Sequence, residues 1–542
     1  MFIINARILE AILMNRNKYF IVILVIILFT SFSACRSSTI DLETIHPESE
    51  IYYQIFVRSF ADSNGDGIGD FNGIAEKLDY LDTLGITAIW LMPIHPSPTY
   101  HGYEVTDYYD VNPEYGTLAD FENLILQANN HGMRIMLDMV FNHTSSQHPW
   151  FKAALNGDSK YRNYYNFTSI STDTATKLGS WGQTIWHVSG NDKYVGYFTS
   201  TMPDLNTYNE EVSQEIFNIS KFWIDKGVKG FRLDAVNHMF GKNEYLNKTY
   251  DYQANISYLS TYKSAVKSYA DDIFIIGEIF EESDYEMVSD YYQGVDAPLD
   301  FPVSGRLRRS LVSDSNPAYV IMLNNIYSAY RSINEDFMSM PFVTNHDLDR
   351  TASLINSDEN ELRLAAEMLM TLPGNPIIYY GEELGMFGSK AGGPELWDET
   401  RRLPFLWNDN YLTNWLSTSD NTLNSINTLN QNVENANNQF LNADSLFNLY
   451  RTMIAVRKNN IALRYGNSFA SYENNTSAVQ GFYREYTYEK MSQKVLVIHN
   501  FGSTEVDIPN VKGKIIYLSN TTEFENAEKI PAKSTVIIEI KR

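Results

Sequence analysis

Three acidic residues of this chain each lie at the carboxyl end of a predicted strand, at positions where they could do chemistry. They are Asp234, Glu278 and Asp347. A carboxylate beside an apolar strand is costly to bury unless it is paired or used. A single one is more often a structural hydrogen-bond acceptor, but three that converge repel one another unless something binds between them. The set therefore predicts a catalytic site that holds a ligand among its carboxylates.

Other ionisable residues also lie near the carboxyl ends of predicted strands. Asp138 ends one of them, and His346 directly precedes Asp347. Arg232 lies two positions before Asp234, so the two side chains project from the same face of the strand. A guanidinium there favours the ionised form of the carboxylate. The sequence therefore predicts a shared cluster of charges.

A different set of oxygen-bearing residues lies in DSNGDGIGD, residues 62–70. Carboxylates alternate there with glycines that permit a tight turn, as in the first half of an EF-hand calcium loop. The second half is missing, because Gly73 stands at the position where an EF-hand has a bidentate glutamate. The loop predicts either an unusual calcium site or a polar turn without metal.

Short apolar strands alternate with amphipathic helices along most of the chain. One such helix, GIAEKLDYLDTLG, ends at Gly85. This alternation predicts a parallel sheet covered by helices, and eight such strands predict a closed (β/α)8 barrel, a TIM barrel of the α/β class. Catalytic groups of such barrels lie at the carboxyl ends of the strands. The predicted strands are 51–60, 86–93, 133–140, 228–235, 272–280, 296–303, 337–347 and 375–385.

Two segments interrupt the alternation. Residues 142–209 are aromatic, Asn-rich and irregular, and they are too long for an ordinary connection, so they predict a domain inserted after the third strand. Residues 465–542 alternate short strands with turns and predict a C-terminal antiparallel β-sandwich domain. The catalytic barrel is then expected in two parts, 36–141 and 210–464.

The N-terminus has the pattern of an export signal. A basic stretch at 15–18 precedes an apolar run at 20–32, and a pair of small residues precedes Cys35, the single cysteine of the chain. The run is shorter than a membrane span needs. It resembles the lipobox of bacterial lipoproteins, which implies a signal peptide at 1–35, a lipid anchor on Cys35 and a place in the cell envelope. A plain signal peptide, and so a secreted protein, is the alternative; translation could also start at Met14.

The composition narrows the choice of partner. A net charge of -24 disfavours nucleic acid and anionic lipid surfaces, because both would repel the chain. The 542 residues are too many for one hydrophobic core. The 37 tyrosines cover core surface first, but exposed rings also offer platforms on which sugar rings stack.

Four motifs identify a family that the chain resembles. They are DMVFNH (138–143), GFRLDAVNH (230–238), GEIF (277–280) and TNHD (344–347). They stand in the order and spacing of the four signature regions of the α-amylase family of glycoside hydrolases, family 13. MPDLN (202–206) resembles the additional region of the amylases intermediate between oligo-1,6-glucosidases and neopullulanases. The resemblance implies that the inserted segment is the family's domain B and that the C-terminal strands are its domain C.

The family mechanism is retaining, and the resemblance assigns its roles. Asp234 is expected to be the nucleophile, Glu278 the general acid and base, and Asp347 the clamp on sugar hydroxyls. A retaining pair lies about 5 to 5.5 Å apart, which adjacent barrel strands can supply. Glu278 is expected to be less directly paired than Asp234 and to keep its proton because its neighbours are negative. The substrate-binding residues that the resemblance implies are Tyr103, His143, Arg232, His238 and His346.

The resemblance also gives the loop at 62–70 a role. In related enzymes such a loop holds a structural calcium ion, which implies Ca²⁺ bound here by Asp62, Asn64, Asp66, the Ile68 carbonyl and Asp70. A second calcium would use Asn142 and Asp204, although the intermediate branch often lacks it.

The specificity is expected to be that of an endo-acting α-amylase on the α-1,4 bonds of starch and maltooligosaccharides. Ala235 and His238 resemble residues of enzymes that act on α-1,4 bonds, and exo-acting α-glucosidases tend to carry aspartate where Tyr100 stands. The alternative is a neopullulanase-like or α-glucosidase (oligo-1,6-glucosidase) activity. A non-catalytic glycan-binding protein or transporter partner is a remote alternative, because such members lose the nucleophile or the acid. We expect a monomer.

Overall fold

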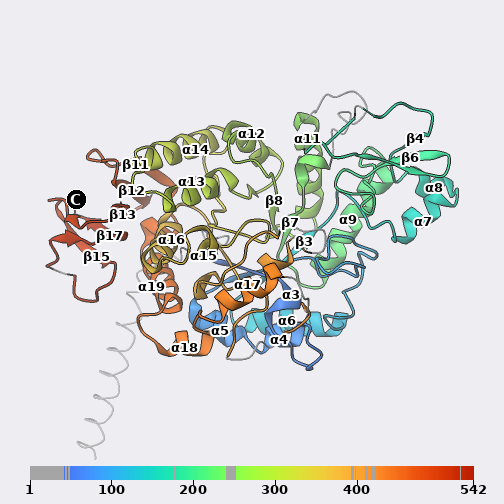
Figure 1. The fold of residues 1–542 in the computed structure, drawn as a ribbon. Helices are drawn as coiled ribbons and strands as arrows, with labels where there is room; N and C mark the ends of the chain where they lie inside the picture. Colours follow the sequence, from blue (N-terminus) through green and yellow to red (C-terminus); the bar gives the residue numbers. More distant parts are fainter. Residues whose placement is uncertain are drawn as a thin grey trace, which may run out of the picture. The chain divides into compact units, whose positions relative to one another are not determined.

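Seven parallel strands form one curved sheet (Figure 1), in the order β10-β1-β2-β3-β7-β8-β9. Nearly every residue in them is buried, as expected for a parallel sheet that is covered on both faces. The strands are β1 (Tyr52–Ile55), β2 (Ala88–Leu91), β3 (Arg134–Met139), β7 (Gly230–Leu233), β8 (Phe274–Gly277), β9 (Ala297–Pro298) and β10 (Ile377–Tyr379).

The segment between β9 and β10 completes the ring. Met340 bridges to Leu299 and Phe342 bridges to Ile377, both in the parallel sense. Because β10 also pairs with β1, the sheet closes into a ring. Isolated bridges, rather than a continuous strand, hold the eighth position between β9 and β10. The prediction of a (β/α)8 barrel is therefore confirmed.

Two predicted strands are shorter than expected. The strand predicted at 296–303 ends at Pro298, and helix α13 (Phe301–Leu311) begins within it. The Asp300 side chain accepts a hydrogen bond from Val303 N, and Pro302 occupies the first turn, where a missing N–H costs nothing. Similarly, β1 ends at Ile55 and the short helix α3 (Val57–Phe60) follows it.

Helices cover the outside of the sheet (Figure 1). The apolar residues of α6 recur at helical spacing and are buried, and a capping box of Thr117 and Asp120 begins it. The predicted helix ending at Gly85 forms as two helices, and Gly85 closes the second with φ +99°. The main helices are α4 (Phe71–Ala75), α5 (Leu78–Leu84), α6 (Leu118–Asn130), α9 (Glu210–Asp225), α11 (Tyr252–Lys267), α12 (Tyr285–Asp290), α14 (Tyr319–Ile333), α16 (Glu359–Thr371), α17 (Asn421–Asn430), α18 (Ala436–Leu441) and α19 (Leu446–Asn459).

A small antiparallel sheet lies in the segment predicted to be inserted after the third strand. Its order is β4-β6-β5, with β4 (Phe167–Ser169), β5 (Trp186–Ser189) and β6 (Asp192–Val195). Its core contains Ile185, Trp186 and Tyr197. Two helices, α7 (Pro149–Leu155) and α8 (Ser159–Arg162), precede it. The segment therefore has a core of its own, while the boundaries at 142 and 209 stay a prediction.

The C-terminal part is an antiparallel β domain, as predicted. Its main sheet has the order β11-β12-β13-β17-β15, with β11 (Ser468–Ser471), β12 (Val479–Tyr488), β13 (Met491–Asn500), β15 (Gly513–Leu518) and β17 (Ser534–Ile540). A second sheet pairs β14 (Val506–Asp507) with β16 (Lys529–Ile530). Leu496, Ile530 and Ile538 belong to one apolar cluster that joins the two sheets.

These descriptions come from a computed structural model that covers residues 42, 46, 49–175, 177–179, 181–239, 252–391, 396, 398–408, 413–416, 421–524 and 526–541. Contacts within the chain separate 1–48 from 49–542, and all elements above belong to the second unit. The signal predicted at 1–35, with Cys35, lies outside the described residues. Of the helices in the described ranges, none has the length and apolar character to cross a membrane.

Candidate active site

Three neighbouring strands bring the predicted carboxylates around one buried arginine. Arg232, on β7, is 0% exposed, and its register partner on β3 is Asp138. Its Nη1 donates to Asp138 Oδ1 at 2.7 Å and to Asp234 Oδ1 at 2.8 Å. Its Nη2 forms an ion pair with Glu278 Oε1 at 2.7 Å. A single guanidinium therefore fixes carboxylates that come from β3 and from the ends of β7 and β8.

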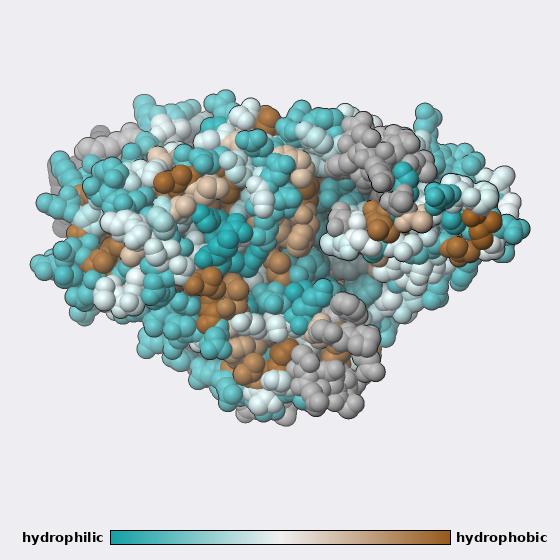
Figure 2. All heavy atoms as spheres, turned by 45° about the horizontal axis from the view of Figure 1, so that its top comes forward, coloured by the Kyte–Doolittle hydropathy of each residue, from teal (hydrophilic) through white to brown (hydrophobic). Residues whose placement is uncertain are grey.

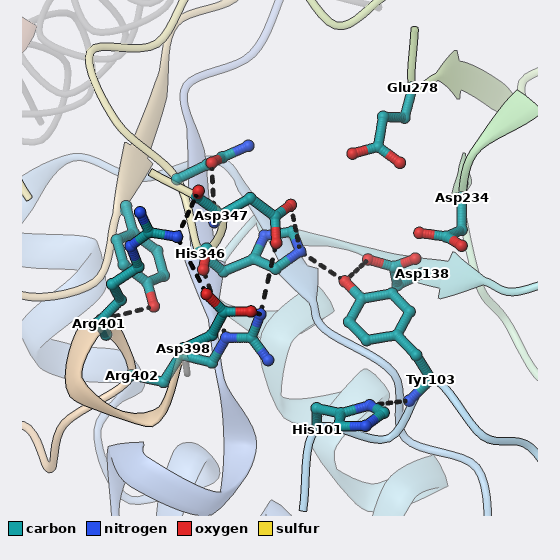
Figure 3. Close-up of polar contacts among 12 residues, drawn as sticks. His101, Tyr103, Asp138, Asp234, Glu278, His346, Asp347, Asp398, Arg401 and Arg402 are labelled. Carbon is teal, nitrogen blue, oxygen red and sulfur yellow. Dashed lines mark hydrogen bonds and ion pairs between the residues drawn. The ribbon is translucent and has the colours of Figure 1, made fainter. Parts of the chain in front are cut away.

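The carboxylates of Asp234 and Glu278 face the same open space, with Asp347 opposite them (Figure 3). That space is part of a cavity of about 490 Å³ at the carboxyl ends of the strands. Arg232 does not line this cavity, and none of its surface is exposed. The predicted site residues that line the cavity are Tyr103, His143, Asp234, His238, Glu278, His346 and Asp347.

Burial and crowding raise the pKa values of both carboxylates of the pair, so that they hold protons jointly near neutral pH. Burial raises the pKa of Asp234 to about 7, while the charge of Arg232 opposes that rise. Burial also raises the pKa of Glu278 to about 7, and the charges of Asp234 and Asp347 add to this effect. The expectation that Glu278 is less directly paired than Asp234 is wrong, since both carboxylates contact Arg232. Glu278 keeps its proton because it is buried among carboxylates.

The turn after Asp234 contacts Glu278 through backbone N–H groups. Ala235 has φ +45°, a left-handed conformation that is rare without glycine. Its N–H donates to Glu278 Oε2 at 2.9 Å, and Val236 N–H donates to the Glu278 carbonyl at 3.2 Å. The strained turn therefore holds the two carboxylates in one fixed arrangement.

Asp347 has a different environment from the pair. Burial alone would raise its pKa, but His346 together with the charges of Arg402 and Arg232 holds the pKa of Asp347 below its usual value. His346 Nε2 lies 3.0 Å from Asp347 Oδ2, and Arg402 Nη2 lies 3.4 Å from Asp347 Oδ1 (Figure 3). Asp347 is therefore ionised across the neutral pH range.

Tyr103 and His346 form one wall of the cavity. Their rings stack with centroids 5.7 Å apart and planes 9° apart, and the Tyr103 hydroxyl lies 2.6 Å from His346 Nε2. The Tyr103 hydroxyl also donates to Asp138 Oδ2 at 3.2 Å. Gln54 Nε2, on β1, lies 2.7 Å from His346 Nδ1. Burial lowers the pKa of His346, so the imidazole is neutral and contacts other polar groups through both ring nitrogens.

The two other predicted histidines lie toward the inserted segment. His143 Nε2 is 3.0 Å from the Tyr103 carbonyl, and the His143 ring packs against the edge of Phe198 at 5.3 Å. His238 ends a 3-10 turn (Val236–His238) and stacks on Tyr197 with ring centroids 4.0 Å apart. Both therefore connect the barrel to the inserted segment as well as lining the cavity.

The sequence did not identify the two arginines near Asp347. Arg402 contacts Asp347, donates from Nε to the His346 carbonyl at 3.3 Å and lies 3.7 Å from Asp398. Arg401 pairs with Asp349 and Asp398 at 2.8 and 3.0 Å. These residues follow no predicted strand. The signal that could have identified them is the adjacent arginine pair in a strongly acidic chain.

The loop at 62–70 is ordered by its own side chains. Asp62 Oδ1 accepts from Gly65 N at 2.7 Å, and Asp66 Oδ1 accepts from Ile68 N at 2.8 Å. Asp70 Oδ1 accepts from Gly73 N at 2.7 Å. Across the described ranges, no group of three acidic, histidine or cysteine side chains converges closely enough to hold a metal ion. An all-oxygen donor set with spare lone pairs suits Ca²⁺ chemically, so the calcium site stays a prediction.

The predicted second calcium site also stays untested. Asn142 Nδ2 lies 3.4 Å from Asp204 Oδ1, and a bridge between His143 and Asp204 joins the two segments. The amide therefore contacts the carboxylate directly.

Known proteins resemble this chain both in sequence and in fold. A family profile described as "Alpha amylase, catalytic domain" matches residues 54–466. Alpha-amylase 3 of Dictyoglomus thermophilum is 37% identical over 91% of this chain and 93% of its own length. Oligo-1,6-glucosidase of Bacillus cereus is 30% identical over 84% and 91%. The crystal structure of an alpha-amylase from H. orenii superposes with a TM-score of 0.80 at 35% identity, covering 91% of this chain and all of the other.

Proposed function

The chain belongs to the α-amylase family of glycoside hydrolases, and from that premise we propose that it is a retaining, endo-acting α-amylase that hydrolyses α-1,4-glucosidic bonds of starch and maltooligosaccharides. One observation carries the proposal. The carboxylates of Asp234 and Glu278 contact the same guanidinium, at 2.8 and 2.7 Å, and face one cavity. A nucleophile and a proton donor that act on one glycosidic bond have to face the same space.

In the first step, an Asp234 oxygen bonds to the anomeric carbon as the bond from that carbon to the leaving oxygen breaks. The Glu278 proton goes to the leaving oxygen, so the departing sugar leaves with a neutral hydroxyl. The raised pKa of Glu278, about 7, lets it carry this proton near neutral pH. Arg232 stabilises whichever carboxylate is charged.

In the second step, water attacks the anomeric carbon and the bond to Asp234 breaks. Glu278, now ionised, takes the proton from that water and regains its initial state. Asp347 remains ionised throughout and accepts hydrogen bonds from sugar hydroxyls, and Tyr103 supplies a ring face for the same sugar.

The endo-acting mode is supported by the end of the cavity near Asp347. Tyr100 lines it and stacks on Trp415, with centroids 5.4 Å apart and planes 15° apart. The Arg402 guanidinium lies 5.9 Å from the Tyr100 ring. The Tyr100 and Trp415 rings thus give this end an aromatic wall at the position where exo-acting α-glucosidases tend to carry an aspartate, and Asp398 is the carboxylate that lies beside Arg402 here.

An oligo-1,6-glucosidase activity is the second candidate, since a relative of that name shares 30% identity over most of both chains. Product chromatography on starch, pullulan and isomaltose separates the two. We expect maltooligosaccharides from starch. Glucose as the first product, or faster cleavage of isomaltose than of maltose, would favour the second candidate.

The first mutational test uses Asp234→Asn. Because the amide cannot attack the anomeric carbon, we expect the rate on starch to fall by at least about 10³-fold. The melting temperature measured alongside checks that the variant is folded. Equal starch digestion by the variant and the unmutated protein would show that the nucleophile is assigned wrongly.

We also propose that the enzyme is anchored in the cell envelope, because its N-terminal sequence has the pattern of a lipoprotein signal. A Cys35→Ser variant of the full chain is expected to move from the membrane fraction to the soluble fraction. An unchanged distribution would exclude a lipid anchor on Cys35.

A further inference from the structure

A buried asparagine on helix α11 contacts the turn that follows Asp234. Asn255 is 0% exposed, and its Nδ2 donates to the Val236 carbonyl at 2.6 Å. Val236 is the second residue after Asp234 and begins a 3-10 turn. Asn255 itself does not line the catalytic cavity. Its connection to the catalytic pair therefore runs through the backbone of this turn.

Asn255 occupies a position where a polar residue is costly. Leu259, Tyr262 and Val266 follow it at helical spacing on the same side of α11, and all three are buried. Polar residues cover most of the face of the molecule in Figure 2, whereas no part of Asn255 reaches the surface. Its Oδ1 has no hydrogen-bond partner among the described residues. A buried acceptor without a partner lowers the free energy of unfolding, so stability alone does not explain an asparagine here.

The turn that Asn255 contacts is strained. Ala235 has φ +45° and ψ +43°, and such a conformation persists only where the surrounding contacts hold it. The Val236 carbonyl accepts from Met239 N at 3.2 Å, within the turn, and from Asn255, which belongs to another element. Asn255 Nδ2 also lies 3.3 Å from the Tyr291 hydroxyl. The asparagine therefore connects the strained turn to the helix outside it.

The same turn sets the environment of Glu278. Burial raises the pKa of Glu278, and the hydrogen bond that Ala235 N–H donates to Oε2 opposes this rise. The opposition arises because a hydrogen bond donated to a carboxylate stabilises its charged form. If the turn relaxes and this donor moves away, the pKa of Glu278 rises further.

Other groups that affect the Glu278 proton come from neighbouring elements. The charged groups that face Glu278 are Arg232, Asp234, Asp138 and Asp347. The titratable rings of Tyr103, His143, His238 and His346 line the same cavity. None of these residues belongs to α11. Because Asn255 carries no charge, its replacement by another neutral residue changes the pKa of Glu278 through the turn.

We propose that Asn255 is a positioning residue that holds the turn after Asp234, so that the nucleophile and the proton donor keep one fixed arrangement. The inference rests on the retaining function proposed above, and it adds a residue that touches neither the substrate nor the reacting atoms. Without the hydrogen bond from Asn255, the strained turn relaxes. Ala235 N–H then leaves Glu278, and the Asp234 carboxylate loses its alignment.

The test compares the pH profiles of kcat/KM on maltohexaose for the unmutated full chain and for Asn255→Ala. We expect kcat/KM at pH 6 to fall by about tenfold or more, because a small displacement of the reacting groups costs rate. The alkaline decrease, which reports the Glu278 proton, should move to higher pH by about half a unit to one unit. An alkaline decrease at the same pH in both proteins would overturn the proposal.

A second variant makes the test independent of the cavity that alanine leaves. Asn255→Leu fills a similar space with a side chain that suits the apolar side of α11, so this variant should fold. It lacks the donor, and we expect the same displacement of the alkaline decrease as in Asn255→Ala. A folded Asn255→Leu variant with the profile of the unmutated enzyme would also overturn the proposal.

Asn500→Ala controls for lost stability. Asn500 is buried in the C-terminal domain, and its Nδ2 donates to the carbonyls of Thr504 and Pro531 at 2.8 and 2.7 Å. Its replacement should lower the melting temperature and leave the alkaline decrease in place. An equal displacement in Asn500→Ala and Asn255→Ala would show that lost stability moves the profile, and the positioning role would be wrong.

The proposal and the function on which it rests fail in different ways. An active Asp234→Asn variant would contradict the retaining function itself. Asn255 variants whose rate and profile match those of an active unmutated enzyme would leave that function intact and would exclude the positioning role.

Discussion

Arg232 is the residue on which the charges of the cavity depend. It is fully buried and faces the carboxylates of Asp138, Asp234 and Glu278. One positive charge cannot compensate three negative ones, so protons remain bound near neutral pH. Burial raises the pKa of Asp138 to about 6, and the pKa values of Asp234 and Glu278 to about 7. The carboxylates therefore titrate as a group.

This arrangement predicts the pH dependence of activity. Glu278 must be protonated to act as an acid, and its pKa is raised to about 7, so kcat/KM on maltohexaose should fall as pH rises through that value. Well beyond it, the decrease should be about tenfold per pH unit. Initial rates from pH 5 to 9 give the profile.

α-Maltosyl fluoride provides the control for that profile. Fluoride leaves with little help from an acid. The decrease of kcat/KM above pH 7 should therefore be much weaker with α-maltosyl fluoride than with maltohexaose. If both substrates lose activity in parallel above pH 7, the decrease reports unfolding or another group rather than the Glu278 proton.

At the residue scale, the sequence predicted the members of the site better than their interactions. The motifs placed Asp234, Glu278 and Asp347 correctly in one cavity. They did not indicate that Glu278 shares Arg232 with Asp234, because that contact depends on the register of β7 beside β8. Arg402 was missed because it approaches Asp347 from a segment that follows no strand.

At the scale of elements, the prediction succeeded where the hydrophobic period was long and regular. The strand VQGFYREYTY coincides with β12, and EEVSQEIFNISKFWIDKG contains all of α9. It failed where a local cap decides the structure, as at Asp300, where an apparent strand becomes α13. The strand predicted at 337–347 forms only bridges, so its pairing depends on the neighbouring strands rather than on its own sequence.

The loop between α3 and α4 carries the calcium prediction. If Ca²⁺ binds the folded loop and not the unfolded chain, a chelator should lower the melting temperature by several degrees. The initial rate should change less, because the described residues of the loop do not line the catalytic cavity. Thermal unfolding with and without a chelator, followed by addition of Ca²⁺, measures the effect.

An Asp62→Asn variant is the matched control for the chelator experiment. It removes one expected ligand charge, so its melting temperature should respond less to the chelator than that of the unmutated protein. A chelator that leaves the melting temperature of the unmutated enzyme unchanged would identify 62–70 as a polar turn without metal.

At the scale of the whole molecule, acidic groups buried outside the cavity link stability to pH. Burial raises the pKa of Glu50 and Glu382 to about 7 and that of Asp300 to about 6. The folded state therefore binds protons that the unfolded chain has already released between about pH 4 and 7. The stability that these protons contribute is complete below the unfolded pKa values and is lost as pH rises through 6 to 7.

We therefore expect the melting temperature to be higher at pH 5 than at pH 8, by an amount equivalent to a few kcal/mol, on the order of 1.4 kcal/mol per pKa unit. The net charge of -24 acts in the same direction, because protonation relieves repulsion. A Glu382→Gln variant separates the two effects. Glu382 accepts hydrogen bonds from Thr344 and Tyr450, and a neutral amide at this position should make the melting temperature depend less on pH. A melting temperature that rises toward pH 8 would contradict this account.

The closure of the barrel has a consequence for how the protein is made. β1 is completed only when β10 pairs with it, and the Tyr53 hydroxyl then donates to Glu383 across a sequence separation of 330 residues. Until the ribosome has released that distant partner, the nascent chain exposes an unpaired apolar edge on which other chains could add. If the protein is exported, as its N-terminal sequence predicts, the cell has to keep the chain from aggregating until nearly the entire polypeptide has been delivered.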